Sequence, residues 1–167
     1  MVTSPGGAVC FLGKSGRGKS TLAASFFLSR GFPVLSDDLA VVQTQGSEWM
    51  VQPGPSEAKL SPPLLRKVGR RRLFSPSPRP VPLRALYLLE RRACDSIRIE
   101  PVGGRESLMA LTRNTLHLTD RSPRALRSNF RLTARVAAGK PIKRLIYPSG
   151  LKHLPEVCRR IADDLGS

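Results

Sequence analysis

The sequence predicts a single α/β domain over residues 1–167, and three observations support this fold class. The length suits one domain and is too short for two of ordinary size. Between Gly7 and Arg30, an apolar run, a glycine-rich turn and an amphipathic helical pattern follow one another. Strand patterns then alternate with helical patterns along the rest of the chain. Such alternation is typical of a sheet covered by helices.

The first elements form a predicted strand–helix–strand unit. Gly7–Leu12 is a short apolar run, which is typical of a buried parallel strand. Lys19–Arg30 has apolar residues at helical spacing and is followed by Gly31, a residue that commonly ends a helix. The apolar run at 33–36 predicts the second strand. We expect the connection between the two strands to be right-handed.

The remaining elements are a hairpin, a long loop and a second series of strands and helices. Segments 39–44 and Glu48–Gln52 flank a Gln-Gly-Ser turn and predict a β-hairpin. Segment 53–82 is rich in proline and carries an arginine cluster at 66–72, so we expect mostly loop there. The other predicted strands are 83–89, 96–100 and 142–147, and the other predicted helices are 105–116, 123–138 and Leu154–Leu165.

Composition narrows the classes of partner and compartment. Lys and Arg total 28 against 12 Asp and Glu, a net charge of +16 that attracts polyanions. The basic residues are scattered and aromatic residues make up only 5%, so we expect no specific nucleic-acid binding. No apolar run approaches the roughly 20 residues that span a bilayer. The three cysteines lack the spacing of a zinc site or a disulfide framework, which favours a reducing cytoplasm.

Several further side chains are expected to have structural roles. We expect Trp49, Tyr87 and Phe130 to lie in the core or to cover apolar surface, and Cys10 to be a small buried residue of the first strand. The arginine cluster at 66–72 has two interpretations. It is either a lid that contacts a phosphoryl group or an acidic partner peptide, or a solvated loop.

The turn between the first strand and helix matches the phosphate-binding loop pattern G-x-x-x-x-G-K-[ST] without a gap. Its glycines allow successive backbone N–H groups to turn inward around phosphate oxygens. The N-terminus of the following helix adds a positive dipole end. The alternative is a glycine-rich turn that binds nothing. The predicted phosphate-binding residues are Gly13, Lys14, Ser15, Gly16, Arg17, Gly18, Lys19, Ser20 and Thr21.

Specific roles follow from the chemistry of three of these residues. Lys19 can reach the β- and γ-phosphates of a nucleoside triphosphate, and the Ser20 hydroxyl can bind Mg²⁺. Thr21 is placed to contact the α-phosphate. The sequence therefore predicts ATP with Mg²⁺ as the ligand, and leaves GTP open as an alternative nucleotide.

Two adjacent acids, Asp37 and Asp38, follow the predicted strand 33–36. In an open parallel sheet, ligands bind at the carboxyl ends of the strands. Neighbouring residues of a strand point to opposite faces, so the two carboxylates can have different roles. One can hold Mg²⁺ and the other can accept the proton of an attacking hydroxyl. The alternative is a solvated acidic turn or a helix cap.

Together, the phosphate-binding loop and the segment 29–40, with Arg30-Gly31, a short strand and Asp37-Asp38, resemble the catalytic domain of HPr serine kinase/phosphorylase. A weaker likeness to small HPr-kinase-like proteins extends over nearly the whole chain. The resemblance implies the P-loop kinase fold also seen in phosphoenolpyruvate carboxykinase, with a mixed sheet flanked by helices. It also implies that Asp38 is the catalytic base, that Lys19 binds phosphate, that Ser20 and Asp37 lie near the metal, and that a homo-oligomer is possible.

The leading hypothesis is therefore an ATP-dependent kinase acting on a hydroxyl, a serine of a protein or peptide. The histidines His117 and His153 both lie downstream of the loop, whereas the bifunctional enzymes have one upstream, which argues against phosphorylase activity. Where those enzymes carry a metal-binding glutamate, this chain has the arginines of 66–72. Two alternatives remain: a regulatory or scaffold module that binds ATP without turnover, and a polyanion binder driven by net charge.

Overall fold

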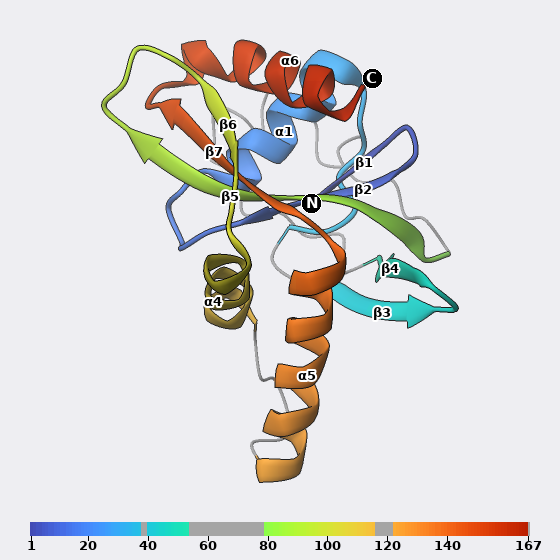
Figure 1. The fold of residues 1–167 in the computed structure, drawn as a ribbon. Coiled ribbons are helices and arrows are strands. Elements are labelled where there is room, and N and C mark those ends of the chain that lie inside the picture. The colour runs from blue at the N-terminus through green and yellow to red at the C-terminus, as the bar shows by residue number, and fades with distance from the viewer. Residues whose placement is uncertain (38–39, 54–78, 116–121, 167) are drawn as a thin grey trace.

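The computed structural model describes residues 1–37, 40–53, 79–115 and 122–166 (Figure 1). Within them, seven strands form one mixed sheet that has helices on both faces. The strands are β1 (Val2–Ser4), β2 (Gly7–Leu12), β3 (Val41–Gln45), β4 (Glu48–Gln52), β5 (Val81–Arg92), β6 (Arg98–Pro101) and β7 (Ile142–Pro148). The helices are α1 (Lys19–Arg30), α4 (Gly104–Asn114), α5 (Pro123–Gly139), the short 3-10 helix η1 (Leu151–His153) and α6 (Leu154–Leu165).

The long strand β5 organises the sheet. It pairs in parallel with β2 on one side and with β7 on the other, and its first residues pair antiparallel with β4. The short strands β1, β3 and β6 add antiparallel to β2, β4 and β7. The carboxyl ends of the parallel strands β2, β5 and β7 therefore lie at one edge of the sheet. The loop that follows β2 begins at this edge.

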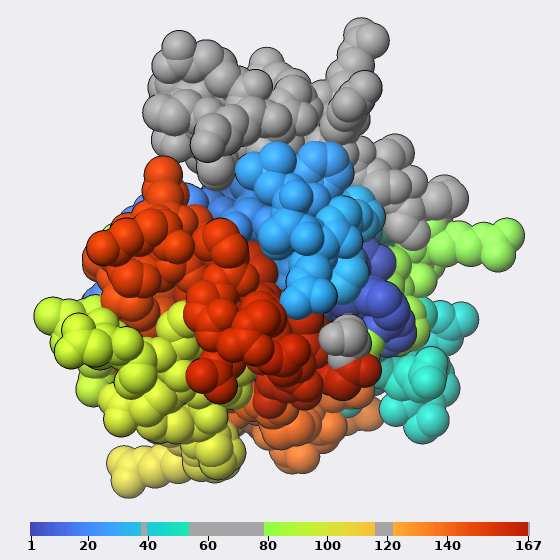
Figure 2. All heavy atoms as spheres, turned by 90° about the horizontal axis from the view of Figure 1, so that it is seen from above, coloured from blue at the N-terminus to red at the C-terminus, as the bar shows by residue number. Residues whose placement is uncertain are grey.

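Two apolar clusters hold helices to opposite faces of the sheet. Tyr87 and Leu89 of β5 pack with α1 and α6, whereas Leu86, one residue out of phase, packs with Val136 of α5. This alternation follows from the pleat, which turns successive side chains to opposite faces. Figure 2 shows α1 and α6 side by side over their face, and Figure 1 shows α4 and α5 beneath the other.

The predicted α/β class and the mixed sheet flanked by helices are confirmed. Helices α1 and α6 have the predicted bounds, and the other predicted strands and helices from 83 onward occur with ends shifted by a few residues. The predicted hairpin occurs as β3 and β4. Strand β5 begins at Val81, so the predicted loop 53–82 ends before it. Residues 54–78, which include the arginine cluster, lie outside the described residues.

The predicted strand at 33–36 is wrong. Only Val34 makes a bridge, antiparallel to Val2, and the Leu35 N–H donates to the Met1 carbonyl at 3.1 Å. The physical reason is that both edges of β2 are already paired, with β1 on one side and β5 on the other. The parallel partner of β2 is therefore β5. The strand–helix–strand unit consists of β2, α1 and β5, and the hairpin of β3 and β4 lies between α1 and β5 in the chain.

Predictions about single buried residues were mostly confirmed. Trp49, Tyr87 and Cys10 are all buried. Phe130 is not in the core, because 52% of it is exposed on α5, and its alternative role as cover for apolar surface stays a prediction. Among the described residues, no helix combines the length and the apolar character needed to cross a membrane.

Candidate nucleotide-binding site

The candidate phosphate-binding loop, residues 13–18, joins the end of β2 to the start of α1. Gly16 and Gly18 have φ values of 79° and 91°, in the left-handed region that glycine adopts without strain. Gly18 is also the N-cap of α1, and no side chain caps the helix. Nor does any acidic residue occupy its first turn. The helix therefore presents its positive end to the loop.

Backbone N–H groups are available where a phosphate would bind. Within the described part of the chain, the amides of Gly18, Lys19 and Ser20 have no hydrogen-bond acceptor. The first amides of a helix lack a partner inside the helix, so an anion satisfies them well. Ser20 and Thr21 are half-buried in the same first turn. The predicted phosphate-binding residues from Gly13 to Thr21 thus meet at one junction.

Lys19 lies over the loop. Its Nζ donates to the carbonyl oxygens of Gly13 at 2.8 Å and of Lys14 at 3.2 Å. An ammonium group held by two carbonyls is close to the loop amides and can also donate to phosphate oxygens placed against them. The predicted role of Lys19 as the phosphate-binding cation therefore fits its position.

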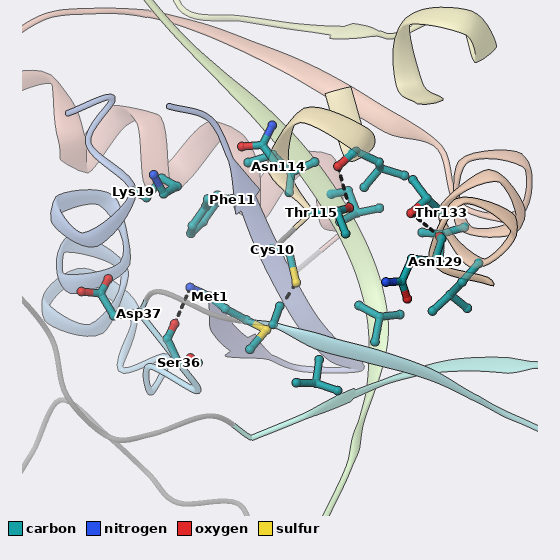
Figure 3. Close-up of a pocket in the computed structure, with 18 residues that line it drawn as sticks. Met1, Cys10, Phe11, Lys19, Ser36, Asp37, Asn114, Thr115, Asn129 and Thr133 are labelled. Atoms are coloured by element: carbon teal, nitrogen blue, oxygen red, sulfur yellow. Dashed lines mark hydrogen bonds between the residues drawn. The ribbon is translucent and has the colours of Figure 1, made fainter. Parts of the chain in front are cut away.

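Lys19 and Asp37 line the same cavity, whose volume is about 340 Å³ (Figure 3). Asp37 is buried, with 8% of its surface exposed. The structure therefore places Asp37 in the same cavity as Lys19, and the predicted role of Asp37 near a metal stays a prediction. Asp38, the predicted catalytic base, lies outside the described residues. His117 also lies outside the described residues. His153, at the end of η1, does not line this cavity.

The cavity lies on the face of the sheet that α4 and α5 cover. Its walls are mainly apolar, formed by residues such as Leu86 of β5, Leu111 of α4 and Val136 of α5. Polar groups come from the two helices, with Asn114 on α4, and Asn129 and Thr133 on α5. A mainly apolar cavity with a few polar groups is typical of a site that binds an organic ligand.

Three residues that sequence reasoning missed hold the loop in place. The Gly13 N–H donates to Asn114 Oδ1 at 3.0 Å, and the Tyr147 hydroxyl donates to the Arg17 carbonyl at 2.8 Å. Arg91 donates from Nη2 to the Gly16 carbonyl at 2.8 Å. Tyr147 is the last residue of the predicted strand 142–147, which gave a signal for it, whereas Arg91 lies two residues beyond the predicted strand 83–89 because β5 is longer than predicted. No sequence signal pointed to Asn114.

Tyr147 also leaves little room for a side chain at residue 18, where the φ of 91° already favours glycine. A Cβ atom built on Gly18 would lie 3.1 Å from the Tyr147 hydroxyl oxygen. The tyrosine ring is buried, and burial raises the pKa of the hydroxyl, so it stays protonated and donates to the loop at neutral pH. The loop is therefore fixed from two sides, by the helix that it starts and by the end of β7.

We expect Gly18→Ala to destabilise the fold by about 1–2 kcal/mol, because an alanine at a left-handed φ is strained. It should also weaken nucleotide binding, since the new methyl group meets Tyr147. Gly46→Ala is the matched control, because Gly46 has a φ of 62° with no atom within 4 Å of the added Cβ. Denaturant unfolding should show similar losses for both variants. Nucleotide binding that weakens equally in both, or in neither, would contradict a specific role of Gly18.

Tyr147→Phe tests the hydrogen bond to the loop separately. The variant keeps the buried ring and loses only the hydroxyl that donates to Arg17, so we expect a loss of about 1 kcal/mol in unfolding free energy. Nucleotide affinity should fall as the loop loosens. Tyr87→Phe is a comparable control, because the Tyr87 hydroxyl donates to Asp164 on α6 instead. An affinity that falls only in the Tyr87 variant would contradict this role of Tyr147.

Two of the predicted residues are suited to hold Mg²⁺, Ser20 and Asp37. Over the described ranges, no group of three or more His, Cys, Asp or Glu residues could hold a metal ion. Such a group is not required for Mg²⁺ beside phosphates, because this ion keeps several waters and takes one or two carboxylates plus phosphate oxygens. A hydroxyl in the first turn of α1 and a buried carboxylate at the cavity of Lys19 fit that pattern.

Cys10, at the floor of the cavity, is not suited to be a nucleophile. Burial raises the pKa of its thiol to about 11, so the thiol stays protonated near neutral pH.

We expect Cys94, which is partly exposed, to react with a thiol reagent, and the buried Cys10 and Cys158 to react only on unfolding. Counting modified thiols before and after adding denaturant checks this. Labelling of Cys10 in the folded protein would contradict the burial of this floor.

Comparisons of this chain with protein-family models, with curated proteins and with solved structures gave no match. Any function assigned to the chain therefore depends on its own loop, helix and cavity. These features supply amide donors, a lysine and a hydroxyl where the loop meets α1, and a carboxylate in the cavity that the lysine also lines. The arrangement can bind a polyphosphate with a divalent ion, beside a cavity that can receive a second molecule.

Proposed function

We propose that this chain is a P-loop kinase of the HPr kinase and phosphoenolpyruvate carboxykinase type. It transfers the γ-phosphoryl group of ATP to a hydroxyl group, a serine of a protein or peptide. One observation carries the proposal: Lys19 lies over a glycine loop at the uncapped N-terminus of α1, and it shares a cavity with the buried Asp37. A turn that bound nothing would need neither the lysine nor the acid.

The phosphate-binding groups of this proposal lie at the start of α1. The amides of Gly18, Lys19 and Ser20 and the ammonium of Lys19 bind the phosphates and hold the γ-phosphoryl group toward the cavity. Ser20 and Asp37 would hold Mg²⁺, which offsets negative charge on the phosphates when it is bound. Positioned donors of this kind provide most of the stabilisation in phosphoryl transfer, because the transition state spreads charge over the phosphoryl oxygens.

The acceptor hydroxyl would enter from the cavity that Lys19 and Asp37 share. Its oxygen forms a bond to the γ-phosphorus while the bond from that phosphorus to the bridging oxygen of ADP breaks. The hydroxyl proton passes to the carboxylate of Asp38, the base that the family resemblance implies. The apolar walls around Leu86, Leu111 and Val136 exclude water from the acceptor and so disfavour hydrolysis of ATP.

A transfer assay with γ-labelled ATP tests the proposal. Purified protein is incubated with the nucleotide, Mg²⁺ and a library of serine-containing peptides, and label on peptide is measured with and without EDTA. We expect Mg²⁺-dependent label on a subset of peptides. Bound nucleotide with no label on any peptide would contradict the kinase and favour the regulatory module that binds ATP without turnover.

A further inference from the structure

Helix α5 carries a stripe of exposed arginines that the proposed function does not use. Arg124, Arg127, Arg131 and Arg135 are spaced by three or four residues, and all four are exposed. Because an α-helix has 3.6 residues per turn, side chains at this spacing lie on one face. Figure 1 shows α5 extending away from the sheet, so much of the helix is open to solvent.

The charge of this arginine stripe is not offset within the described residues. Helix α5 contains no aspartate or glutamate, and none of the ion pairs found in the described ranges involves its arginines. The arginines of α6 differ, because Arg159 pairs with Glu156 and Asp163, and Arg160 pairs with Glu156. Of these two helices, α6 therefore pairs its arginines with its own acids, whereas α5 presents a row of arginines that no acid of the helix offsets.

One apolar side chain flanks the arginine stripe. Phe130 is 52% exposed, and it lies three residues from Arg127, so the two side chains are neighbours on the helix surface. Arg135 is held in place at one end of the stripe, because its guanidinium lies 5.6 Å from the centre of the Trp49 ring. The exposed surface of α5 therefore combines a row of cations with one exposed aromatic ring.

The inner face of the same helix belongs to the candidate site. Asn129, Thr133 and Val136 line the cavity that Lys19 and Asp37 share. A molecule bound to the outer face of α5 would therefore lie one helix diameter from that cavity, about 10 Å away. This distance is short enough for one partner to reach both places.

We propose that the outer face of α5 binds an acidic segment of a partner protein that also carries an apolar side chain. From the first to the last of the four arginines the helix rises by eleven steps of about 1.5 Å, or about 16 Å, which matches about five residues of an extended segment. Carboxylates of the segment pair with the guanidinium groups, and its apolar side chain packs on Phe130. This surface goes beyond the proposed function and does not require phosphoryl transfer.

A protein partner fits this surface better than a nucleic acid does. Phe130 is the one aromatic residue of α5, so the helix offers no series of rings on which successive bases could stack. An acidic segment with an apolar residue matches both the arginines and Phe130. Recognition of acidic motifs by clustered arginines is an established mode of peptide binding.

Fluorescence anisotropy tests this proposal with a labelled glutamate-rich peptide that contains one central leucine. The expected result is saturable binding that weakens with salt and is absent for the counterpart peptide with glutamine in place of glutamate. The double variant Arg127→Gln, Arg131→Gln should bind about tenfold more weakly, since it removes two of the four guanidinium groups that pair with the carboxylates. The matched control is Arg159→Gln, Arg160→Gln on α6, which should bind as the unaltered protein does.

Three results would overturn the proposal. They are equal binding by the α5 double variant and the α6 control, equal binding of the glutamine peptide, or tighter binding of a labelled single-stranded oligonucleotide than of the acidic peptide. Phe130→Ser adds an independent readout, because it should weaken the leucine-containing peptide and leave a leucine-free acidic peptide unaffected. Measuring Mg·ATP affinity on the same samples separates the two proposals, because loss of nucleotide binding bears on the kinase alone.

Discussion

Replacing Lys19 with alanine is expected to lower the rate of phosphoryl transfer by about 10²–10³-fold, the usual cost of removing one donor aimed at the charge of a transition state. The affinity for Mg·ATP should also fall, because the ammonium that lies over the loop binds phosphate in the ground state as well. Single-turnover transfer of label measures the first effect, and equilibrium titration measures the second. Unfolding should change little, since the Lys19 side chain is only half-buried.

Lys152→Ala is the control for this variant. Lys152 is an exposed lysine of η1, and its substitution removes the same amount of net charge without touching the loop. If both variants lose nucleotide affinity equally, the protein attracts ATP through its charge of +16 alone. That result would favour the polyanion binder and contradict a phosphate-binding loop.

The second large effect is expected for Asp38→Asn. An amide cannot accept the proton of the attacking hydroxyl, so transfer should fall by about 10²–10⁴-fold. Affinity for Mg·ATP should stay near that of the unaltered protein, because the base acts on the acceptor. The same assay on Asp95→Asn, which replaces an exposed acid of the turn after β5, controls for the change in charge. Full transfer by Asp38→Asn would contradict the role that the family resemblance implies.

Local signals predicted most of the elements. Helix α1 was predicted with correct bounds because Gly31 ends it. The Gly31 N–H donates to the Phe27 carbonyl at 2.9 Å, and Gly31 has the left-handed conformation that is expected at the end of a helix. The hairpin of β3 and β4 was predicted from Gly46, which turns with a φ of 62°. These features depend on neighbouring residues, so a local pattern suffices to find them.

Pairing between distant strands was harder to predict. The apolar run at 33–36 was predicted to be a strand. Val34 forms only a single bridge, because β1 and β5 already pair with the two edges of β2. Strand β1 has three residues, too few to show a period. Which strand lies beside which depends on burial summed over the whole sheet, and no short segment contains that information.

In the candidate site, too, the local features could be predicted and the contacts between distant residues could not. The loop and Lys19 were predicted because their spacing is local and chemically specific. The contacts that support the loop come from residues far along the chain, since Asn114 is 101 positions from Gly13 and Tyr147 is 130 from Arg17. Their carbonyl and hydroxyl groups are common in any protein, so only the fold reveals that they face the loop.

Titration calorimetry of the folded protein with Mg·ATP, repeated with Mg·GTP, tests the central claim most directly. A loop whose amides and lysine enclose phosphates predicts saturable uptake of one nucleotide per chain, which EDTA weakens. Circular dichroism on the same sample establishes that the protein is folded. If folded protein takes up neither nucleotide, the loop after β2 does not bind phosphate, and the proposed kinase is contradicted.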